Sequence, residues 1–261
     1  MDLGLKDRVA IVGGGSKGLG RACADSLAQE GANLVICSRD GEELNRAAGE
    51  ISAASGAEVL AVSGDLSQLT DIQTLIERTV GHFGRLDVLV NNSGGPPAGR
   101  AANTSEEVWR QSIDMALMFF IRMSQEAVPH MKEKRWGRIV NILASSVFQP
   151  IDNLVTSGVT RMGAVAFAKS LADEVGRDNI LVNNVAPGYL LTDRMMHIFE
   201  TRSNDTGASV EDLLQAHSST IPVGRLGRPE ELGDLSHFCP LRRTATPQEL
   251  RYWWMVAWCD R

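Results

Sequence analysis

Short apolar runs rich in β-branched residues alternate with longer amphipathic stretches along most of this 261-residue chain. Runs of this kind predict buried strands, and the stretches between them are long enough for crossover helices. The alternation is typical of an α/β fold with a parallel, doubly wound sheet and helices on both faces. The predicted strands span residues 9–12, 33–37, 58–62, 86–90, 138–142 and 180–185.

A glycine-rich loop follows the first predicted strand and leads into a predicted helix over residues 21–29. Glycines let the backbone approach a pyrophosphate, and the N-terminus of a helix stabilises its negative charge. Between a strand and a helix, such a loop predicts a dinucleotide site. The expected cofactor-binding residues of the loop are Gly14, Ser16, Lys17, Gly18, Leu19 and Gly20.

The GxxxGxG spacing of these glycines resembles the cofactor loop of the short-chain dehydrogenase/reductase family, which has a single-domain Rossmann-type fold. Later motifs are also similar to the family's, in the same order and over most of the chain. The resemblance implies that Asp65 and Leu66 lie at the adenine and that Asn91 and Gly94 hold the nicotinamide ribose. The other positions it assigns to cofactor binding are Asn92, Ser93, Pro187, Gly188 and Thr192.

The charges near the second predicted strand favour NADP(H) over NAD(H). Enzymes that use NAD usually carry an acid there, which binds the 2′-hydroxyl of the ribose. In this chain Ser38 and Arg39 occupy that position, and Lys17 adds a second cation. Two cations suit a 2′-phosphate, although Asp40 nearby leaves open a contact with a ribose hydroxyl.

The resemblance places the catalytic Ser, Tyr, Lys and Asn of the family at positions where this chain has Ala144, Ser157, Arg161 and Ala116. We expect Ser157 and Arg161 to act at the substrate oxygen, together with a hydroxyl from Ser145 or its neighbour Ser146. Arg161 is also expected to bind the cofactor ribose. An arginine is no general acid at neutral pH, and loss of a positioned acid typically costs ~10²–10⁴ in rate.

These residues predict an NADP(H)-dependent oxidoreductase that reduces a carbonyl by hydride transfer. The segments 94–99 and 149–154 resemble a subgroup that is similar to 3-oxoacyl-(acyl-carrier-protein) reductases but has a non-standard tetrad. The substrate is then a small ketone or an acyl thioester, and the family resemblance implies a homo-oligomer, either a dimer or a tetramer. The alternatives are a non-catalytic dinucleotide-binding sensor or partner subunit, and an unstable product of a shifted reading frame.

The charge balance argues against a nucleic acid or an anionic membrane as partner, since the net charge is −6 and no long run of Lys or Arg occurs. The first seven residues do not resemble a signal peptide, and no apolar run approaches the ~20 residues that cross a bilayer. The four cysteines form no CxxC pair, which favours reduced thiols and a cytoplasmic location. The histidines lack metal-ligand spacing, so no metal is expected.

The chain departs from the family pattern near its end. We expect residues 1–236 to form the Rossmann-type domain, with a helical lid at about 192–220, and residues 237–261 to form an atypical tail. Family members end on a strand and an Asp-Gly-Gly turn, whereas this tail carries Trp253, Trp254 and Trp258. Reading the codons of residues 252–260 one base upstream yields Leu-Val-Asp-Gly, which indicates a frameshift near residues 237–241. The gene sequence tests this hypothesis, because a single-base shift must restore the usual ending.

Overall fold

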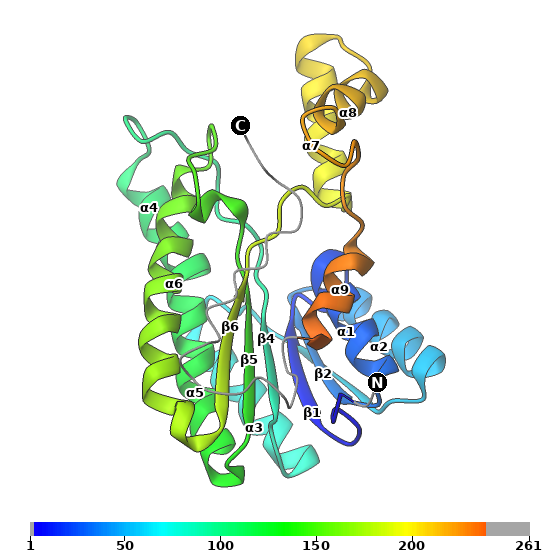
Figure 1. Ribbon diagram of the computed structural model, residues 1–261, viewed down its shortest axis with the longest axis vertical. Helices are drawn as coiled ribbons and strands as arrows, with labels where there is room; N and C mark the ends of the chain where they lie inside the picture. The colour runs from blue at the N-terminus through cyan, green and yellow to red at the C-terminus, as the bar shows by residue number, and fades with distance from the viewer. Residues whose placement is uncertain (1–2, 239–261) are drawn as a thin grey trace.

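Six parallel strands form one sheet in the computed structural model, which describes residues 3–238. The strand order is β3-β2-β1-β4-β5-β6, so the direction of winding reverses between β1 and β4 (Figure 1). In such sheets ligands bind at the carboxyl ends of the strands, at the point of reversal. The strands are β1 Val9–Gly13, β2 Asn33–Ser38, β3 Val59–Ser63, β4 Val88–Asn91, β5 Gly137–Ile142 and β6 Ile180–Val185.

Two layers of helices cover the sheet and divide its apolar side chains into two cores. One core lies under α1, α2 and α9, and the other lies under α3, α5 and α6 (Figure 1). Each buried strand contributes alternate residues to the two cores, because successive side chains of a strand point to opposite faces. The α-helices are α1 Gly18–Gln29, α2 Gly41–Ser55, α3 Leu69–Phe83, α4 Glu106–Ile113, α5 Phe119–Lys134, α6 Val155–Val175, α7 Asp193–Thr206, α8 Val210–Ser218 and α9 Pro229–Phe238, with shorter helical turns η1 Asp114–Met118, η2 Ser145–Val147 and η3 Gly176–Asp178.

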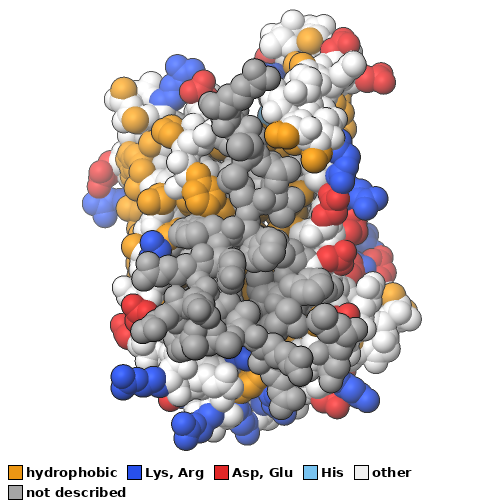
Figure 2. All heavy atoms as spheres, in the orientation of Figure 1, with side chains coloured by type: hydrophobic (Ala, Val, Ile, Leu, Met, Phe, Trp, Pro, Cys, Tyr) orange, Lys and Arg blue, Asp and Glu red, His pale blue; other side chains and the backbone are white. Residues whose placement is uncertain are grey.

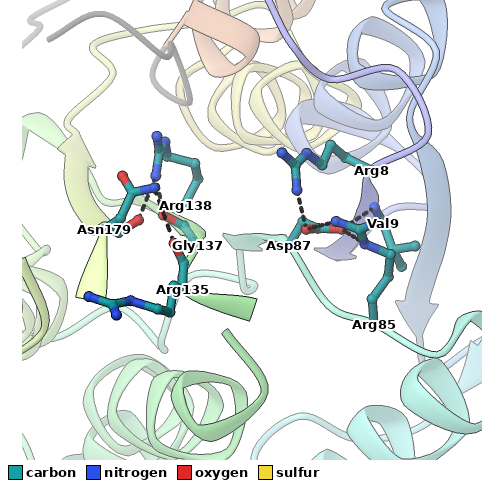
Figure 3. A network of polar contacts seen from close by, with 8 residues as sticks. All are labelled: Arg8, Val9, Arg85, Asp87, Arg135, Gly137, Arg138 and Asn179. Carbon is teal, nitrogen blue, oxygen red and sulfur yellow. Dashed lines mark hydrogen bonds and ion pairs between the residues drawn. The ribbon is translucent and has the colours of Figure 1, made fainter. Parts of the chain in front are cut away.

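The fold confirms the predicted α/β class and each of the six predicted strands, with bounds that differ by one or two residues. The largest difference is at β4, which begins at Val88 rather than at residue 86. Asp87, just before β4, lies outside the strand, and its carboxylate accepts hydrogen bonds at the amino edge of the sheet. Both Arg8 and Arg85 donate hydrogen bonds to Asp87, and so does the amide of Val9 (Figure 3).

A second cluster at the same edge surrounds Arg138, which is only 2% exposed. Its guanidinium donates to the backbone carbonyls of Gly137 and Asn179 (Figure 3). The ring of Trp136 lies against two guanidiniums, 4.0 Å from Arg8 and 4.3 Å from Arg138 between carbon and ring centroid. These polar contacts fix the amino edge of the sheet and lie far from the carboxyl ends, so we assign them to stability.

Two helices, α7 and α8, lie beyond the carboxyl ends of the strands (Figure 1). They occupy the segment for which the sequence predicts a helical lid. Their own small apolar cluster consists of Phe199, Ile221 and Leu226, with Tyr189 packed against it. Because this cluster is separate from the two cores of the sheet, α7 and α8 form a unit that is stabilised largely by its own contacts.

The predictions for the tail cannot be compared with the structure, because residues 239–261 lie outside the described residues. These residues include the three tryptophans of the tail, Cys239 and Cys259. Within residues 3–238, β6 pairs with β5 alone. Cys23 and Cys37 are buried, as predicted, and form no disulfide within residues 3–238. Burial next to Asp71 and Asp65 raises the pKa of Cys37 to about 12. No helix of the described chain has both the length and the apolar character needed to span a bilayer.

Candidate active site

The loop between β1 and α1 requires glycine at several positions. Gly14 and Gly18 have φ angles of 61° and 58°, a left-handed conformation that favours glycine. A Cβ on Gly20 would overlap the backbone carbonyl of Gly14. The Nδ2 of Asn92, after β4, donates a 3.0 Å hydrogen bond to the carbonyl of Gly13. The loop is therefore held against the end of β4.

The start of α1 has the properties of an anion site. Lys17 precedes the helix with an extended backbone and makes no side-chain capping bond, and the first turn holds no acid. The amide N–H groups of that turn are therefore left for an external acceptor, to which the helix dipole adds a favourable field. Thr192, which precedes α7, lies close to Gly18, since its Cγ2 is 3.9 Å from the position of a Cβ there. The start of α1 therefore suits the pyrophosphate of a dinucleotide.

The cations that the sequence assigns to a 2′-phosphate differ from that interpretation in one respect. Lys17 Nζ lies 3.1 Å from Glu43 Oε2, and Ser16 Oγ donates to the same carboxylate at 3.3 Å. The two-cation argument overlooked this acid, because Glu43 lies on α2 and is distant in sequence. Arg39, by contrast, is exposed and has no ion-pair partner among residues 3–238. Ser38 lies beside it as the last residue of β2.

Asp40 is not free to bind a ribose hydroxyl through Oδ1. That oxygen accepts the amides of Glu42 and Glu43, both at 3.1 Å, and so caps the N-terminus of α2. Capping of this kind satisfies helix amides that would otherwise lack partners. The alternative role that the sequence left open for Asp40 therefore competes with a structural one.

Asp65 and Leu66 follow β3, where the sequence places the adenine. Asp65 Oδ1 accepts the amide of Ser67 at 2.9 Å, and the Asp65 amide donates to Asp71 at 2.8 Å. Leu66 packs close to Gly13, since its Cδ1 lies 3.3 Å from the position of a Cβ there. Both residues thus lie beside the glycine loop, and their contact with adenine remains a prediction.

Asn91 does not reach the cofactor surface, contrary to the sequence-based expectation. It is fully buried, and its Nδ2 donates to Asn141 Oδ1 at 2.9 Å and to Ser124 Oγ at 3.2 Å. Asn141 donates in turn to Asn184 at 2.9 Å. Because these three asparagines share one register across β4, β5 and β6, they form a ladder inside the sheet. Ser93 and Gly94, which follow Asn92, lie at the edge instead.

The Pro-Gly segment after β6 lies against the turn after β5. The amide of Ser145 donates to the carbonyl of Pro187 at 3.0 Å, and Gly188 follows directly. Ser145 is 6% exposed, and the structure uses its backbone for this contact. Ser146 Oγ, the other hydroxyl that the sequence considered, lies 3.4 Å from Ser157 Oγ. The structure therefore selects Ser146 as the partner of Ser157.

Ser157 and Arg161 lie one turn apart on α6 and contact each other. Arg161 Nε donates to Ser157 Oγ at 3.3 Å, and Arg161 Nη1 donates to the carbonyl of Ile142 at 2.9 Å. Ser146, Ser157 and Arg161 thus form a hydrogen-bonded chain beside the carboxyl end of β5. All three are buried, with exposures of 6%, 7% and 5%.

Burial lowers the pKa of Arg161 to about 10, and the positive charge of Arg194 adds to the effect. At neutral pH the guanidinium therefore keeps its proton. It is able to stabilise negative charge on an oxygen but not to act as an acid there. Arg194, at the start of α7, was not among the predicted site residues, and no motif in the sequence signals it.

Two further family positions carry no polar group. Ala116 is fully buried in η1, a π-helical turn between α4 and α5, and Ala144 has an extended backbone before η2. Tyr189, the one tyrosine among residues 3–238, packs its ring on His217 at a centroid distance of 4.1 Å. The described site therefore offers hydroxyls and one buried cation at the end of β5.

Comparison with known proteins shows which family the chain is similar to. The short chain dehydrogenase family matches residues 8–203. A 3-oxoacyl-(acyl-carrier-protein) reductase from Aquifex aeolicus is 32% identical over 238 residues, which are 91% of this chain and 92% of that protein. L-sorbose reductase from Gluconobacter frateurii, solved with NADPH and L-sorbose, has a TM-score of 0.92 and 29% identity over 98% of this chain and 97% of its own.

A polyketide ketoreductase for actinorhodin, solved with NADPH, is also similar. Its TM-score is 0.88 at 27% identity, covering 96% of this chain and 95% of its own. All three proteins are reductases by name, and the two solved structures hold NADPH. On the matched residues and the strand order together, the chain belongs to the short-chain dehydrogenase/reductase family.

Proposed function

We propose that this protein is an NADP(H)-dependent carbonyl reductase with a non-standard catalytic group. The observation that carries the proposal is the hydrogen-bonded chain of Arg161, Ser157 and Ser146, which occupies the positions of the family's cation and acid. When bound, the cofactor supplies a hydride to the carbonyl carbon. One NADPH and one proton are consumed, and an alcohol and NADP⁺ are formed.

The roles of the side chains follow from the donors and acceptors. Arg161 Nε donates to Ser157 Oγ, so the hydroxyl proton of Ser157 is free to point to another acceptor. That acceptor is the substrate oxygen or Ser146 Oγ. As the oxygen gains charge, Ser157 donates a hydrogen bond to it, and the Arg161 charge stabilises it. The proton arrives from solvent, because neither group releases one easily at neutral pH.

The cofactor preference rests on Arg39, which has no ion-pair partner among the described residues. Lys17 joins it only if the 2′-phosphate draws it from Glu43. The names of the relatives support a ketone or a 3-oxoacyl-thioester-like substrate. The buried free thiols of Cys23 and Cys37 support a cytoplasmic location.

The proposed homo-oligomer uses the face formed by α4 and α6. Ile113 on α4 and Val159 and Met162 on α6 are 39%, 55% and 49% exposed. Hydrophobic side chains gather along the left side of the view in Figure 2, where Figure 1 shows these helices. An exposed apolar group of this kind is typical of an interface between subunits.

The test is titration of the full chain with NADPH and NADH by fluorescence, followed by loss of absorbance at 340 nm with ketones, quinones and 3-oxoacyl thioesters. We expect turnover, and a fall of roughly 10²-fold in kcat for Arg161→Ala and of about 10-fold for Ser157→Ala. Ser170→Ala, at an exposed position of the same helix, is the control.

Three results contradict the proposal in different ways. Tight NADPH binding without turnover favours the non-catalytic sensor or partner subunit, for which Ala116 and Ala144 are the supporting observation. Absence of NADPH binding by folded protein rejects the cofactor site itself. Turnover that does not respond to Arg161→Ala assigns the chemistry to other residues.

A further inference from the structure

Arg161 is a buried cation with no carboxylate partner in the described chain. Its guanidinium is 5% exposed and has five N–H donors, of which the structure pairs one on Nε and one on Nη1. Both acceptors, Ser157 Oγ and the Ile142 carbonyl, are neutral. Charged side chains are almost never buried unless they are paired. The ring of Phe120, with its centroid 5.9 Å from the guanidinium carbon, is a further contact. Arg161 therefore keeps N–H donors without a partner and a positive charge that no carboxylate of the described chain balances.

Arg194, at the start of α7, supplies a second cation near the end of β4. Its guanidinium lies flat on Gly95, because a Cβ on that glycine would be 2.7 Å from both Nη1 and Nη2. Its only hydrogen bond in the described chain is a long one of 3.5 Å to the Gly95 carbonyl. The absence of a side chain on Gly95 is thus what lets Arg194 reach the loop after β4.

The two guanidiniums lie at the ends of neighbouring strands, since Arg194 contacts Gly95 after β4 and Arg161 donates to Ile142 at the end of β5. The charge of Arg194 contributes to the lowered pKa of Arg161, after burial. Neither Asp152 nor Asp193, the acids nearest to them in sequence, forms an ion pair with either arginine within residues 3–238. Two cations thus lie near the ends of β4 and β5 without an anion from the described chain. Such a pair is complementary to a planar carboxylate, which accepts paired guanidinium bonds.

We propose that the substrate is an oxo acid, whose carboxylate is bound by Arg194 while its carbonyl oxygen lies at Arg161 and Ser157. This inference rests on the proposed reductase function and names its substrate class. The substrate carboxylate neutralises the charge of Arg194. The carbonyl oxygen, which gains negative charge during reduction, contacts the buried guanidinium of Arg161. The same two contacts orient the carbonyl carbon, since they hold the substrate at two points.

The experiment compares oxo acids with their neutral methyl esters in the NADPH oxidation assay. Pyruvate is paired with methyl pyruvate, and acetoacetate with methyl acetoacetate. We expect kcat/KM to be about 10- to 100-fold higher for the acids, as loss of a charged hydrogen-bonded pair predicts. Arg194→Gln is expected to bring the acid-to-ester ratio near one, and Arg194→Lys to restore part of it. Arg202→Gln, an exposed arginine on the same helix, is the control for net charge.

A binding arm separates this inference from the reductase proposal. Thermal unfolding is measured without NADP⁺ and with saturating NADP⁺, in each case with either malonate or neutral malonamide. A rise in Tm with malonate alone, lost in Arg194→Gln, supports the carboxylate site even if no substrate is turned over. Equal rates for acids and esters overturn the inference while leaving the reductase proposal intact. A malonate effect that disappears once NADP⁺ is bound also overturns it, because the anion then binds where the cofactor phosphates lie.

Discussion

Single residues decide which chemistry remains at this site. The guanidinium of Arg161 holds a charge where the family resemblance places a lysine, and Ser157 holds a hydroxyl where it places a tyrosine. In the proposed reductase, the first exchange keeps the positive charge and the second replaces the acid with a hydroxyl. We expect such a site to stabilise an oxyanion well and to protonate it slowly.

Arg39 is the residue on which cofactor preference is expected to depend. Replacement by Ala removes the exposed cation beside Ser38 and should weaken NADPH binding by about 10- to 100-fold, while NADH binding changes little. Lys17→Ala is the matched comparison. Its effect should be smaller, because Lys17 must first leave Glu43. Fluorescence titration with both cofactors measures the ratio, and equal losses for NADPH and NADH argue against a 2′-phosphate contact.

The stability of the unit formed by α7 and α8 is expected to depend on pH through one buried histidine. His217, at the end of α8, packs between Tyr189 and Phe199 with ring centroid distances of 4.1 and 5.7 Å. Its Nε2 is buried without a hydrogen-bond partner among the described residues. Burial, together with the charge of Arg202, lowers the pKa of His217. The folded state therefore prefers the neutral ring.

The sign of the pH effect follows from this lowered pKa. Above the unfolded value of about 6.5 the ring is neutral in both states and contributes no pH dependence. As the pH falls below that value, the unfolded chain takes up the proton more readily, so the folded state loses stability. Thermal unfolding between pH 8 and pH 5 should show this loss in the native protein and a smaller one in His217→Gln. His197→Gln, an exposed histidine on α7, should behave as the native protein does. Equal pH profiles for all three proteins contradict the assignment.

At the scale of the whole molecule, the apolar face of α4 and α6 should determine assembly. Met162→Glu places a charge among Ile113 and Val159, which are exposed beside it, and should convert the proposed dimer or tetramer to smaller species. Light scattering coupled to size exclusion measures the mass. Val223→Glu, at a residue that is 65% exposed and lies between α8 and α9, is the control. A native protein that is already monomeric rejects the oligomer, and a Met162→Glu protein of unchanged mass assigns the interface to another face.

The fold also explains the position of the candidate site. The strand order reverses between β1 and β4, so the glycine loop, the segment after β4 and the Pro-Gly segment meet at one edge. Ser157 and Arg161 reach that edge because α6 runs back along β5 and β6. The amino edge holds instead the Asp87 and Arg138 networks, which stabilise the sheet (Figure 3).

The sequence by itself determined the α/β class, the six strands and the glycine loop. These depend on local patterns, because a buried parallel strand is a continuous apolar run and a close turn demands glycine at fixed positions. It also assigned Ser157 and Arg161 to one site, and the structure places both on α6, where a spacing of four residues brings them into contact.

Only the tertiary structure decided how residues distant in sequence meet. It paired Lys17 with Glu43, turned Asn91 into the sheet, selected Ser146 instead of Ser145, and brought Arg194 onto Gly95. None of these contacts has a local signature, because each depends on the direction of a side chain and on the packing of separate elements. The physical reason is that hydrogen bonds and charges act over a few ångströms in space, whatever the separation along the chain.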